Sequence, residues 1–265
     1  MIEQKRLSEW LSTYQPNMLS VVIPAHNEVG NIENTIEVIS AKLREENILH
    51  EILVINDNSQ DKTEDILKSM LDKYPELHYV NNPPPNNGYG YAVRYGLEMF
   101  HGEFVAIMMA DGSDSPDDLI QFYKKINEGF DCVFGSRFIS GGRTVDYPWP
   151  KLFLNRIANL TIQLLFFIPY NDITNAFKMF RRNVVAGVQP LLSNHFNLTV
   201  ELPLKAIVRR YKYAVVPNSW HNRKEGISKF NINEMGSRYI FIILYCYLEK
   251  LLSRGDYLSS DNKPE

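Results

Sequence analysis

Residues 19–28 of the chain read Leu19-Ser-Val-Val-Ile-Pro-Ala-His-Asn-Glu28. The run up to Ile23 is apolar and rich in β-branched residues, Pro24 ends it, and polar residues follow, which predicts a buried strand and then a loop. Apolar side chains then recur at helical spacing, at positions 32, 36, 39 and 43. The stretch therefore predicts the order strand, loop, helix.

This order recurs along the first half of the chain. The apolar runs 51–55, 77–80 and 104–109 each precede a polar loop and a further helical pattern. Alternating units of this kind predict an α/β fold with a mostly parallel sheet and helices on both faces. Such sheets bind ligands at the carboxyl ends of their strands. We therefore expect the polar loops after Ile23, Ile55 and Met109 to lie together.

Composition narrows the class of protein. The chain has 265 residues, 45% of them hydrophobic, which suits one large domain with appendages. A formal net charge of -3 gives no cationic field, so nucleic acid is not an expected partner. Cys132 and Cys246 lack disulfide or zinc spacing, and the first ten residues lack the apolar stretch of a secretion signal. A reducing, cytoplasmic location is expected.

Two apolar segments mark the second half, at 157–168 and 239–252. Both are shorter than the roughly 20 apolar residues that a membrane-crossing helix needs. Basic residues stand near their ends: Lys151, Arg156, Arg238, Lys250 and Arg254. Two interpretations stay open, because such segments either lie along a membrane surface or form ordinary core helices.

Carboxylates in the strand-end loops are candidates for binding a nucleotide and a metal. Asp57 follows a buried strand and Glu28 lies in the first loop, where each can accept hydrogen bonds from a base or ribose. Asp111 follows an apolar strand directly, a costly place for a carboxylate that binds nothing. Mg²⁺ or Mn²⁺ on a diphosphate is its natural partner, since Ser115 already caps the next helix. No glycine-rich dinucleotide or ATP fingerprint occurs.

Six short motifs follow one another between residues 19 and 230. They are Val21-Val-Ile-Pro-Ala-His-Asn-Glu28, Asn56-Asp-Asn-Ser59, Asn87-Gly-Tyr-Gly-Tyr-Ala92, Ala110-Asp-Gly-Ser113, Gly135-Ser-Arg137 and His221-Asn-Arg-Lys-Glu-Gly-Ile-Ser-Lys229. In this order they resemble glycosyltransferase family 2, and more narrowly its dolichol-phosphate mannose synthase and polyprenyl-phosphate glycosyltransferase branch. The resemblance implies a GT-A fold and an inverting transfer from GDP-mannose or a UDP-sugar. It also implies a divalent metal, Mg²⁺ or Mn²⁺, and a polyprenyl or dolichyl phosphate acceptor.

The resemblance assigns the donor and metal roles to single positions. The nucleotide-sugar-binding residues it implies are Pro24, His26, Glu28, Asp57 and Asp111. Asp111 also matches the metal-binding aspartate, and Ser113 stands where a further metal contact is often glutamine. The chain departs from the family pattern at Met109, where the first carboxylate of Asp-x-Asp would stand. One firm metal carboxylate remains, with Asp114 as a possible helper.

The acceptor side is cationic by the same resemblance. Its phosphate-binding positions are Arg137, Arg223, Ser228 and Lys229, and the catalytic set is Asp111, Arg137 and Arg223. Guanidinium groups pair with phosphate oxygens in bidentate fashion, whereas lysine supplies a point charge. Three further cations have less support for the same field: Arg143, Arg156 and Lys178.

The implied reaction is a single displacement. An acceptor phosphate is ionised at neutral pH and needs no general base, so catalysis is alignment plus stabilisation of the leaving diphosphate. One alternative is transfer to a glycan hydroxyl, with Asp114 or Glu201 as the base. A second is an inactive nucleotide-sugar-binding protein, which Met109 favours.

These interpretations divide the chain into three parts. Residues 1–230 form a GT-A catalytic domain that includes acceptor loops 139–150 and 221–229. Residues 231–258 form a C-terminal amphipathic, interfacial helix, and 259–265 are a disordered tail. The expected location is peripheral, on the cytoplasmic face of a membrane, either by the apolar segments alone or with a membrane partner protein.

Overall fold

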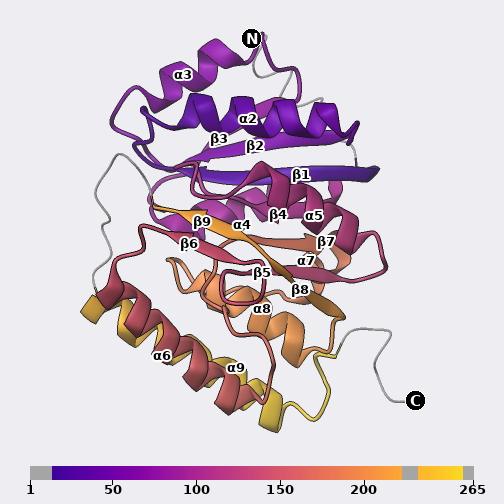
Figure 1. The fold of residues 1–265 in the computed structure, drawn as a ribbon, viewed down its shortest axis with the longest axis vertical. Coiled ribbons are helices and arrows are strands. Elements are labelled where there is room, and N and C mark those ends of the chain that lie inside the picture. The colour runs from indigo at the N-terminus through magenta and orange to yellow at the C-terminus, as the bar shows by residue number, and fades with distance from the viewer. Residues whose placement is uncertain (1–13, 223–231, 259–265) are drawn as a thin grey trace.

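A seven-stranded sheet forms the centre of the computed structural model, which describes residues 14–222 and 232–258. Its strands are β1 (Gln15–Ala25), β2 (His50–Asn56), β3 (Leu77–Asn81), β4 (Gly102–Ile107), β5 (Cys132–Ser136), β7 (Lys178–Arg181) and β8 (Tyr213–Pro217). They lie in the order β3-β2-β1-β4-β7-β5-β8 (Figure 1). β7 is antiparallel to β4 and β5, and the other strands run parallel to one another. The predicted α/β class and mostly parallel sheet are confirmed.

Helices cover both faces of this sheet. One face packs against α2 (Ile32–Glu45), α3 (Thr63–Met70) and α5 (Pro116–Ile126). The other face packs against α4 (Tyr89–Met99), α6 (Trp149–Phe166), α7 (Arg182–Gly187), α8 (Leu198–Val208) and α9 (Ile232–Leu252). Because neighbouring residues of a strand point to opposite faces, the central strands are apolar at nearly every position.

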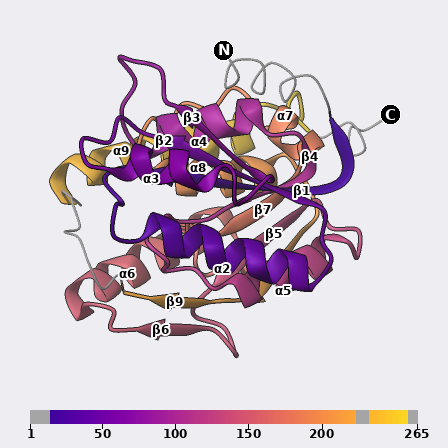
Figure 2. The same cartoon turned by 90° about the horizontal axis from the view of Figure 1, so that it is seen from above.

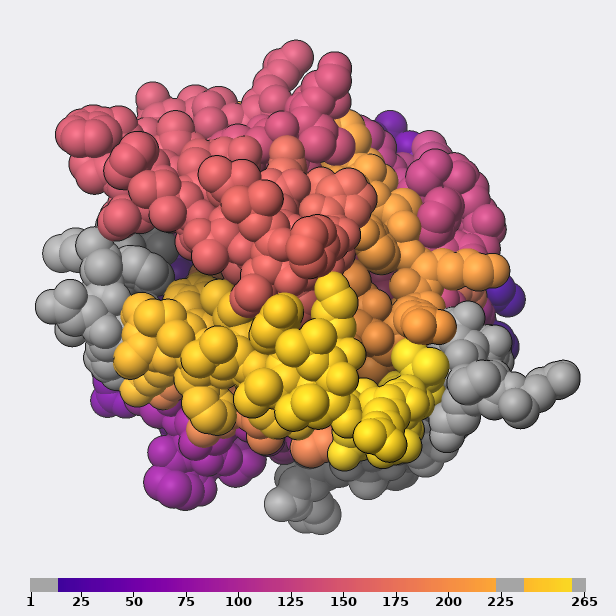
Figure 3. Space-filling model, turned by 90° about the horizontal axis from the view of Figure 1, so that it is seen from below, coloured from indigo at the N-terminus to yellow at the C-terminus, as the bar shows by residue number. Residues whose placement is uncertain are grey.

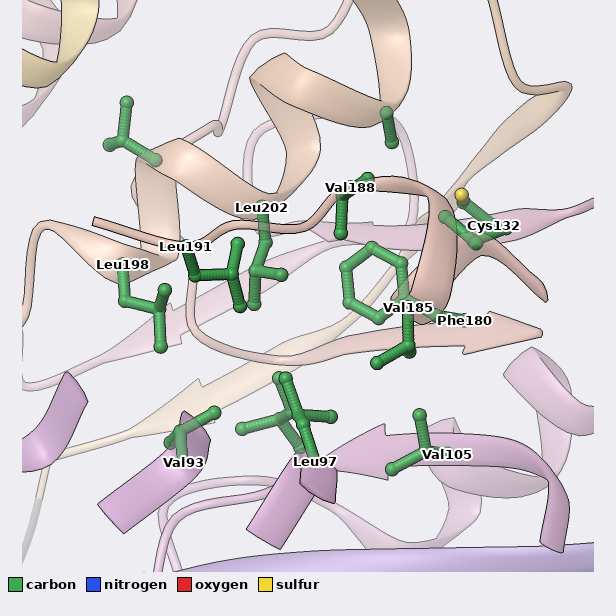
Figure 4. Packing of buried hydrophobic residues seen from close by; sticks show 14 of the residues in the cluster. Val93, Leu97, Val105, Cys132, Phe180, Val185, Val188, Leu191, Leu198 and Leu202 are labelled. Atoms are coloured by element: carbon green, nitrogen blue, oxygen red, sulfur yellow. The ribbon is translucent and has the colours of Figure 1, made fainter. Parts of the chain in front are cut away.

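The core under α4 and α8 shows how this second face closes. Val93 and Leu97 of α4 share one cluster with Val105 of β4 and with Leu198 and Leu202 of α8 (Figure 4). All are buried, and a fully buried aliphatic side chain contributes roughly 1.5–3 kcal/mol to the free energy of unfolding. This packing fixes the loop between α7 and α8 against the first turn of α4.

The glycines of α4 serve this packing. A Cβ at Gly96 would lie 2.5 Å from Val22 Cγ1 and 3.2 Å from Ile55 Cγ1, so only glycine lets α4 approach the sheet this closely. At Gly90 a Cβ would lie 2.4 Å from the backbone carbon of Asn194. Their spacing, which superficially suggests a phosphate loop, thus has a structural cause.

Helices α6 and α9 lie side by side on the outer surface (Figures 1 and 3). Each buries one side, with Ile162 and Phe166 of α6 and Ile242 and Cys246 of α9 in the core. Each exposes the other side, and together these apolar residues form what we call the α6–α9 face: Trp149, Phe153, Leu154, Ile157, Leu160, Leu164, Phe167, Ile240, Phe241, Leu244, Leu248, Leu251 and Leu252. The core-helix interpretation is therefore confirmed for the buried sides, and contact of the exposed sides with a membrane surface stays a prediction.

Among residues 14–222 and 232–258, no helix combines the length and the apolar content that a membrane span requires.

A small second sheet stands beside the main one. β6 (Arg143–Val145) and β9 (Ser219–His221) pair in parallel, outside the main sheet (Figure 2). Trp220 of β9 also forms an antiparallel bridge with Asp114 of the loop after β4. The ribbon thus connects the segment that leads into α6 with the loop that carries Asp111.

Candidate functional site

The loops after β1 and β2 interlock at the carboxyl edge of the sheet. His26 Nδ1 lies 2.6 Å from the Asp57 carbonyl oxygen, and the Asp57 N–H donates to the Ala25 carbonyl at 2.8 Å. The Glu28 N–H donates to Thr63 Oγ1 at 2.9 Å. These bonds join two neighbouring strand ends, so His26, Glu28 and Asp57, three of the positions predicted to bind a nucleotide-sugar, lie along one rim.

Asp57 has two protein donors of its own. Asn82 Nδ2 donates to Asp57 Oδ1 at 2.7 Å, and the Gly88 N–H donates to Asp57 Oδ2 at 2.8 Å. Only 4% of Asp57 is exposed. The carboxylate therefore fixes the loops after β2 and β3 relative to each other, and its contact with a base or ribose stays a prediction. Glu28, half-buried, accepts from Asn31 Nδ2 at 2.9 Å.

The loop after β4 presents two oxygen atoms suited to a hard cation. Half-buried Asp111 accepts the Ser113 N–H at 3.1 Å through Oδ1, and Gly112 between them has φ +68°. Ser113 Oγ is buried and has no hydrogen-bond partner among the described residues. A buried hydroxyl left without a partner costs free energy, so a ligand at this point would relieve it.

A metal at this loop would need further ligands. No three His, Cys, Asp or Glu side chains gather into a metal site within the described parts of the chain. Mg²⁺ commonly takes one or two protein carboxylates and fills its remaining positions with substrate phosphates and water. Asp111 and Ser113 fit that pattern, and Met109 in place of a second carboxylate leaves more of the coordination to the diphosphate.

Asp114 is a buried carboxylate next to this loop. Its Oδ2 accepts the Met109 N–H at 3.0 Å, and 7% of the residue is exposed. Burial raises the pKa of Asp114 to about 7, Asp111 and Asp118 raise it too, and the Met109 N–H and Arg137 lower it. The Asp114 carboxyl therefore keeps its proton to a much higher pH than an ordinary aspartate does.

Arg137 is placed near these carboxylates and is held by another. Its Nε and Nη2 donate to Asp172 Oδ2 and Oδ1 at 2.8 and 2.7 Å, and its backbone N–H donates to Asp172 Oδ2 at 3.0 Å. The guanidinium also lies 5.6 Å from the ring centre of Tyr147, in predicted acceptor loop 139–150. Asp172 therefore neutralises the charge of Arg137, and the predicted phosphate contact of Arg137 stays a prediction.

Lys178 completes the buried charges on this side. Its Nζ donates to the Ile173 carbonyl at 3.1 Å and to the Asn175 carbonyl. Burial lowers the pKa of Lys178 to about 7; Asp172 and Asp114 raise it, and Arg137 lowers it further. Charges from β7, from the loops after β4 and β5 and from the loop before β7 thus influence one another.

The remaining predicted residues divide into three groups. Arg223, Ser228 and Lys229 lie outside the described residues. Arg143 is exposed on β6, and Arg156 of α6 donates to the Asn171 carbonyl at 3.0 Å. Pro24 is buried near the end of β1, two residues before His26.

Glu201, named above as an alternative base, belongs to the core. It is fully buried in α8, pairs with Lys205 Nζ at 2.9 Å, and accepts the N–H groups of Leu192 and Ser193 at 2.8 and 2.7 Å. Because Glu201 is fully buried, and its oxygens bond the Lys205 ammonium and two N–H groups of the loop before α8, that nomination was wrong.

Sequence reasoning missed Asp172, the partner of Arg137. Its signal was indirect: a buried arginine needs a carboxylate, and Asp172 stands in a short polar stretch between α6 and β7. It also missed Asp118, which accepts the Ser219 N–H at 2.6 Å and ties α5 to β9.

Comparisons with known proteins agree with this geometry. The glycosyl transferase family 2 model matches residues 20–188. Polyprenol monophosphomannose synthase of Mycolicibacterium smegmatis is 27% identical over 216 residues, which are 80% of each chain. Dolichol-phosphate mannosyltransferase of Pyrococcus furiosus is 29% identical over 213 residues, 80% of this chain but 58% of the longer relative.

Solved structures share the fold. Glucosyl-3-phosphoglycerate synthase from Mycobacterium tuberculosis, crystallised with Mn²⁺, UDP and phosphoglyceric acid, superposes with a TM-score of 0.66 at 16% identity. The match covers 92% of this chain and 82% of the other. The likeness confirms the predicted GT-A arrangement of the sheet and helices. Because the family model matches more than half of the chain, the protein belongs to glycosyl transferase family 2 and is a glycosyltransferase.

Proposed function

We propose that this glycosyltransferase moves a hexose from a nucleotide-sugar to a polyprenyl or dolichyl phosphate at a membrane surface. The names of the two relatives support the lipid acceptor. The observation that carries the proposal is the α6–α9 face, because it begins at Trp149, at the end of loop 139–150 beside the strand-end loops. A glycan acceptor gives no reason for an exposed apolar face at that place.

The face suits a bilayer surface. Phe167 is 88% exposed, and Leu252 is 70% exposed. Soluble monomers rarely expose apolar patches of this extent without using them. Helices that bury an apolar side in the headgroup region while basic residues flank them bind membranes from one side. The proposal places the enzyme on the cytoplasmic face of the membrane. A membrane partner protein would strengthen this attachment.

On the donor side, the rim formed by His26, Glu28 and Asp57 would receive the nucleotide. Asp111 and Ser113 would hold a divalent ion, Mg²⁺ or Mn²⁺, which supplies charge neutralisation to the leaving diphosphate when bound. The preorganised loops would align the donor, and no protein nucleophile is required for a single inverting displacement.

On the acceptor side, an ionised phosphate attacks without a base. Four residues are proposed to orient this phosphate: Arg137, Arg223, Ser228 and Lys229. Arg137 would do so through the guanidinium N–H groups that do not bond Asp172. Asp172 would keep the guanidinium in place during the reaction.

A second candidate, transfer to a glycan hydroxyl, is favoured by one observation. A general base works best with a pKa near the working pH, and the pKa of Asp114 is raised to about 7 beside Asp111. The Asp114→Asn variant separates the two functions, because a phosphate acceptor needs no base and a hydroxyl acceptor does.

The test is a transfer assay with labelled GDP-mannose and UDP-glucose, Mg²⁺ or Mn²⁺, and a polyprenyl phosphate or an oligosaccharide. Lipid-linked product supports the proposal, product on the oligosaccharide alone supports the second candidate, and neither product with any donor contradicts both. Asp111→Ala should lower transfer at least about a thousandfold without unfolding the protein. The control is Asp117→Ala, an exposed carboxylate on α5.

A further inference from the structure

A groove with a basic rim lies at the far end of the α6–α9 face. It has a volume of about 610 Å³ and is formed by the last turns of α6 and α9 and the turn after α8. Phe166, Ile207 and Leu251 are among its apolar lining residues, and Arg210, Lys250 and Arg254 are its basic ones. No carboxylate lines it.

The three basic side chains are exposed at the groove. Lys250 Nζ donates to the Phe166 carbonyl at 2.6 Å, which satisfies the end of α6 without neutralising the ammonium. Glu249, the acidic residue of the same turn, pairs with Arg209 at 2.8 and 3.0 Å. Its charge is therefore balanced within the core and away from the rim.

The groove continues the apolar surface. Leu251 belongs both to its lining and to the α6–α9 face, and Phe167 and Leu252 flank it. Figure 3 shows the ends of the two helices side by side on this surface. Arginine and lysine at the border of an apolar face place their charge at headgroup level while their stems cover apolar surface.

This place is separate from the candidate reaction site. Helix α6 has 18 residues, so its two ends lie about 27 Å apart. Trp149 at one end belongs to loop 139–150, whereas Phe166 at the other end lines the groove. Arg210 comes just before β8, at the amino-terminal edge of the main sheet.

We propose that this groove binds the phosphate of an anionic phospholipid in the membrane on which the α6–α9 face rests. The inference depends on the membrane contact in the proposed function and adds a second, electrostatic contact. A free phosphate would satisfy the cations alone, but the apolar half of the lining matches the acyl chains of a lipid. Membrane contacts at both ends of α6, at Trp149 and at the groove, would fix the orientation of the enzyme on the membrane. In this orientation the reaction site faces the lipid acceptor.

The test compares vesicle binding of the full chain. Wild-type protein should partition more strongly into phosphatidylcholine vesicles that contain phosphatidylglycerol than into pure phosphatidylcholine. The double variant Arg210→Gln with Arg254→Gln should lose about 30-fold in its partition into the anionic vesicles and little into the neutral ones. Added salt should weaken wild-type binding to the anionic vesicles more than it weakens the double variant's.

The matched control is Lys68→Gln with Lys73→Gln, which removes two exposed cations around α3, away from the α6–α9 face. It should bind anionic vesicles as wild type does. Equal losses in both double variants would contradict a specific site, because they would reflect net charge alone.

A local probe distinguishes the two sources of phosphate. Both cysteines are buried, so a thiol-reactive fluorophore placed by Ser253→Cys on the lining reports the groove selectively. Its emission should shift with anionic vesicles and stay unchanged with millimolar inorganic phosphate. A shift with inorganic phosphate alone would overturn the lipid assignment. Binding to neutral vesicles without a phosphatidylglycerol increment overturns only this inference, whereas no binding to any vesicle removes the membrane part of the proposed function.

Discussion

The two sides of the candidate site are held together by different forces. On the nucleotide side, neutral side chains and backbone groups interlock the loops after β1, β2 and β3, with Asp57 as the buried carboxylate among them. On the acceptor side, Asp114, Arg137, Asp172 and Lys178 influence one another as buried charges. The contrast implies that the loss of one charge destabilises the first side less than the second.

The largest effect should come from breaking the Arg137–Asp172 pair. Asp172→Asn keeps the size of the side chain but leaves a buried guanidinium without its counter-charge. We expect the free energy of unfolding, measured by urea denaturation, to fall by about 3–5 kcal/mol. Replacing both partners, as Arg137→Met with Asp172→Leu, should restore part of that loss. A loss below about 1 kcal/mol in Asp172→Asn would remove the claim that buried charge organises the acceptor side.

A smaller effect should appear in the pH dependence of stability. The pKa of Asp114 lies at about 7 in the folded protein, above its usual 3.8. The stability that its protonated form contributes is therefore complete below pH 4 and is lost as the pH rises through 7. Between pH 5 and pH 8 the wild type should lose about 2 kcal/mol more of its unfolding free energy than Asp114→Asn does.

The exposed neighbour Asp117 provides the control for that measurement. Asp117→Asn should follow the wild-type curve, since Asp117 is exposed on the first turn of α5. Parallel curves for the wild type and Asp114→Asn would contradict the raised pKa.

The smallest effect is expected on the nucleotide side. In Asp57→Asn the amide oxygen can still accept from Asn82 or from Gly88, and water can reach the partly exposed Gly88 N–H that loses its partner. The unfolding free energy should fall by about 1 kcal/mol, the usual net value of one hydrogen bond. Asp65→Asn, an exposed residue of α3, is the charge control. A loss as large as that of Asp172→Asn would erase the contrast between the two sides.

The same contrast explains how far the sequence could be interpreted. The strands and helices up to α5 follow from short apolar patterns, and the loops after β1, β2 and β4 meet at one edge because parallel strands bring them there. The placement of Asp57 and Asp111 at this edge therefore follows from their positions in the sequence. The glycines of α4 do not lead to the prediction of a phosphate-binding loop, because their spacing does not fit one.

The second half depends on pairings between distant segments. Asp172 pairs with Arg137, which is 35 positions away in the chain, and the Ser219 N–H donates to Asp118, which is 101 positions away. The antiparallel strand β7 is inserted between β4 and β5, which no local pattern indicates. Glu201 was misassigned although its partners are near in the chain, because no sequence pattern shows that the loop with Leu192 and Ser193 folds onto its carboxylate.

The β6–β9 ribbon links the main sheet to the surface helices in an unusual way. β6 leads into α6 after only three residues, and the chain that leaves β9 returns as α9, which lies against α6. The pairing of β6 with β9 and the packing of α6 on α9 therefore limit how far α6 can shift relative to the β6–β9 ribbon. A one-residue insertion between Val145 and Trp149 would displace α6 relative to the β6–β9 ribbon, whereas an insertion at the open turn around Gly129 would leave both in place.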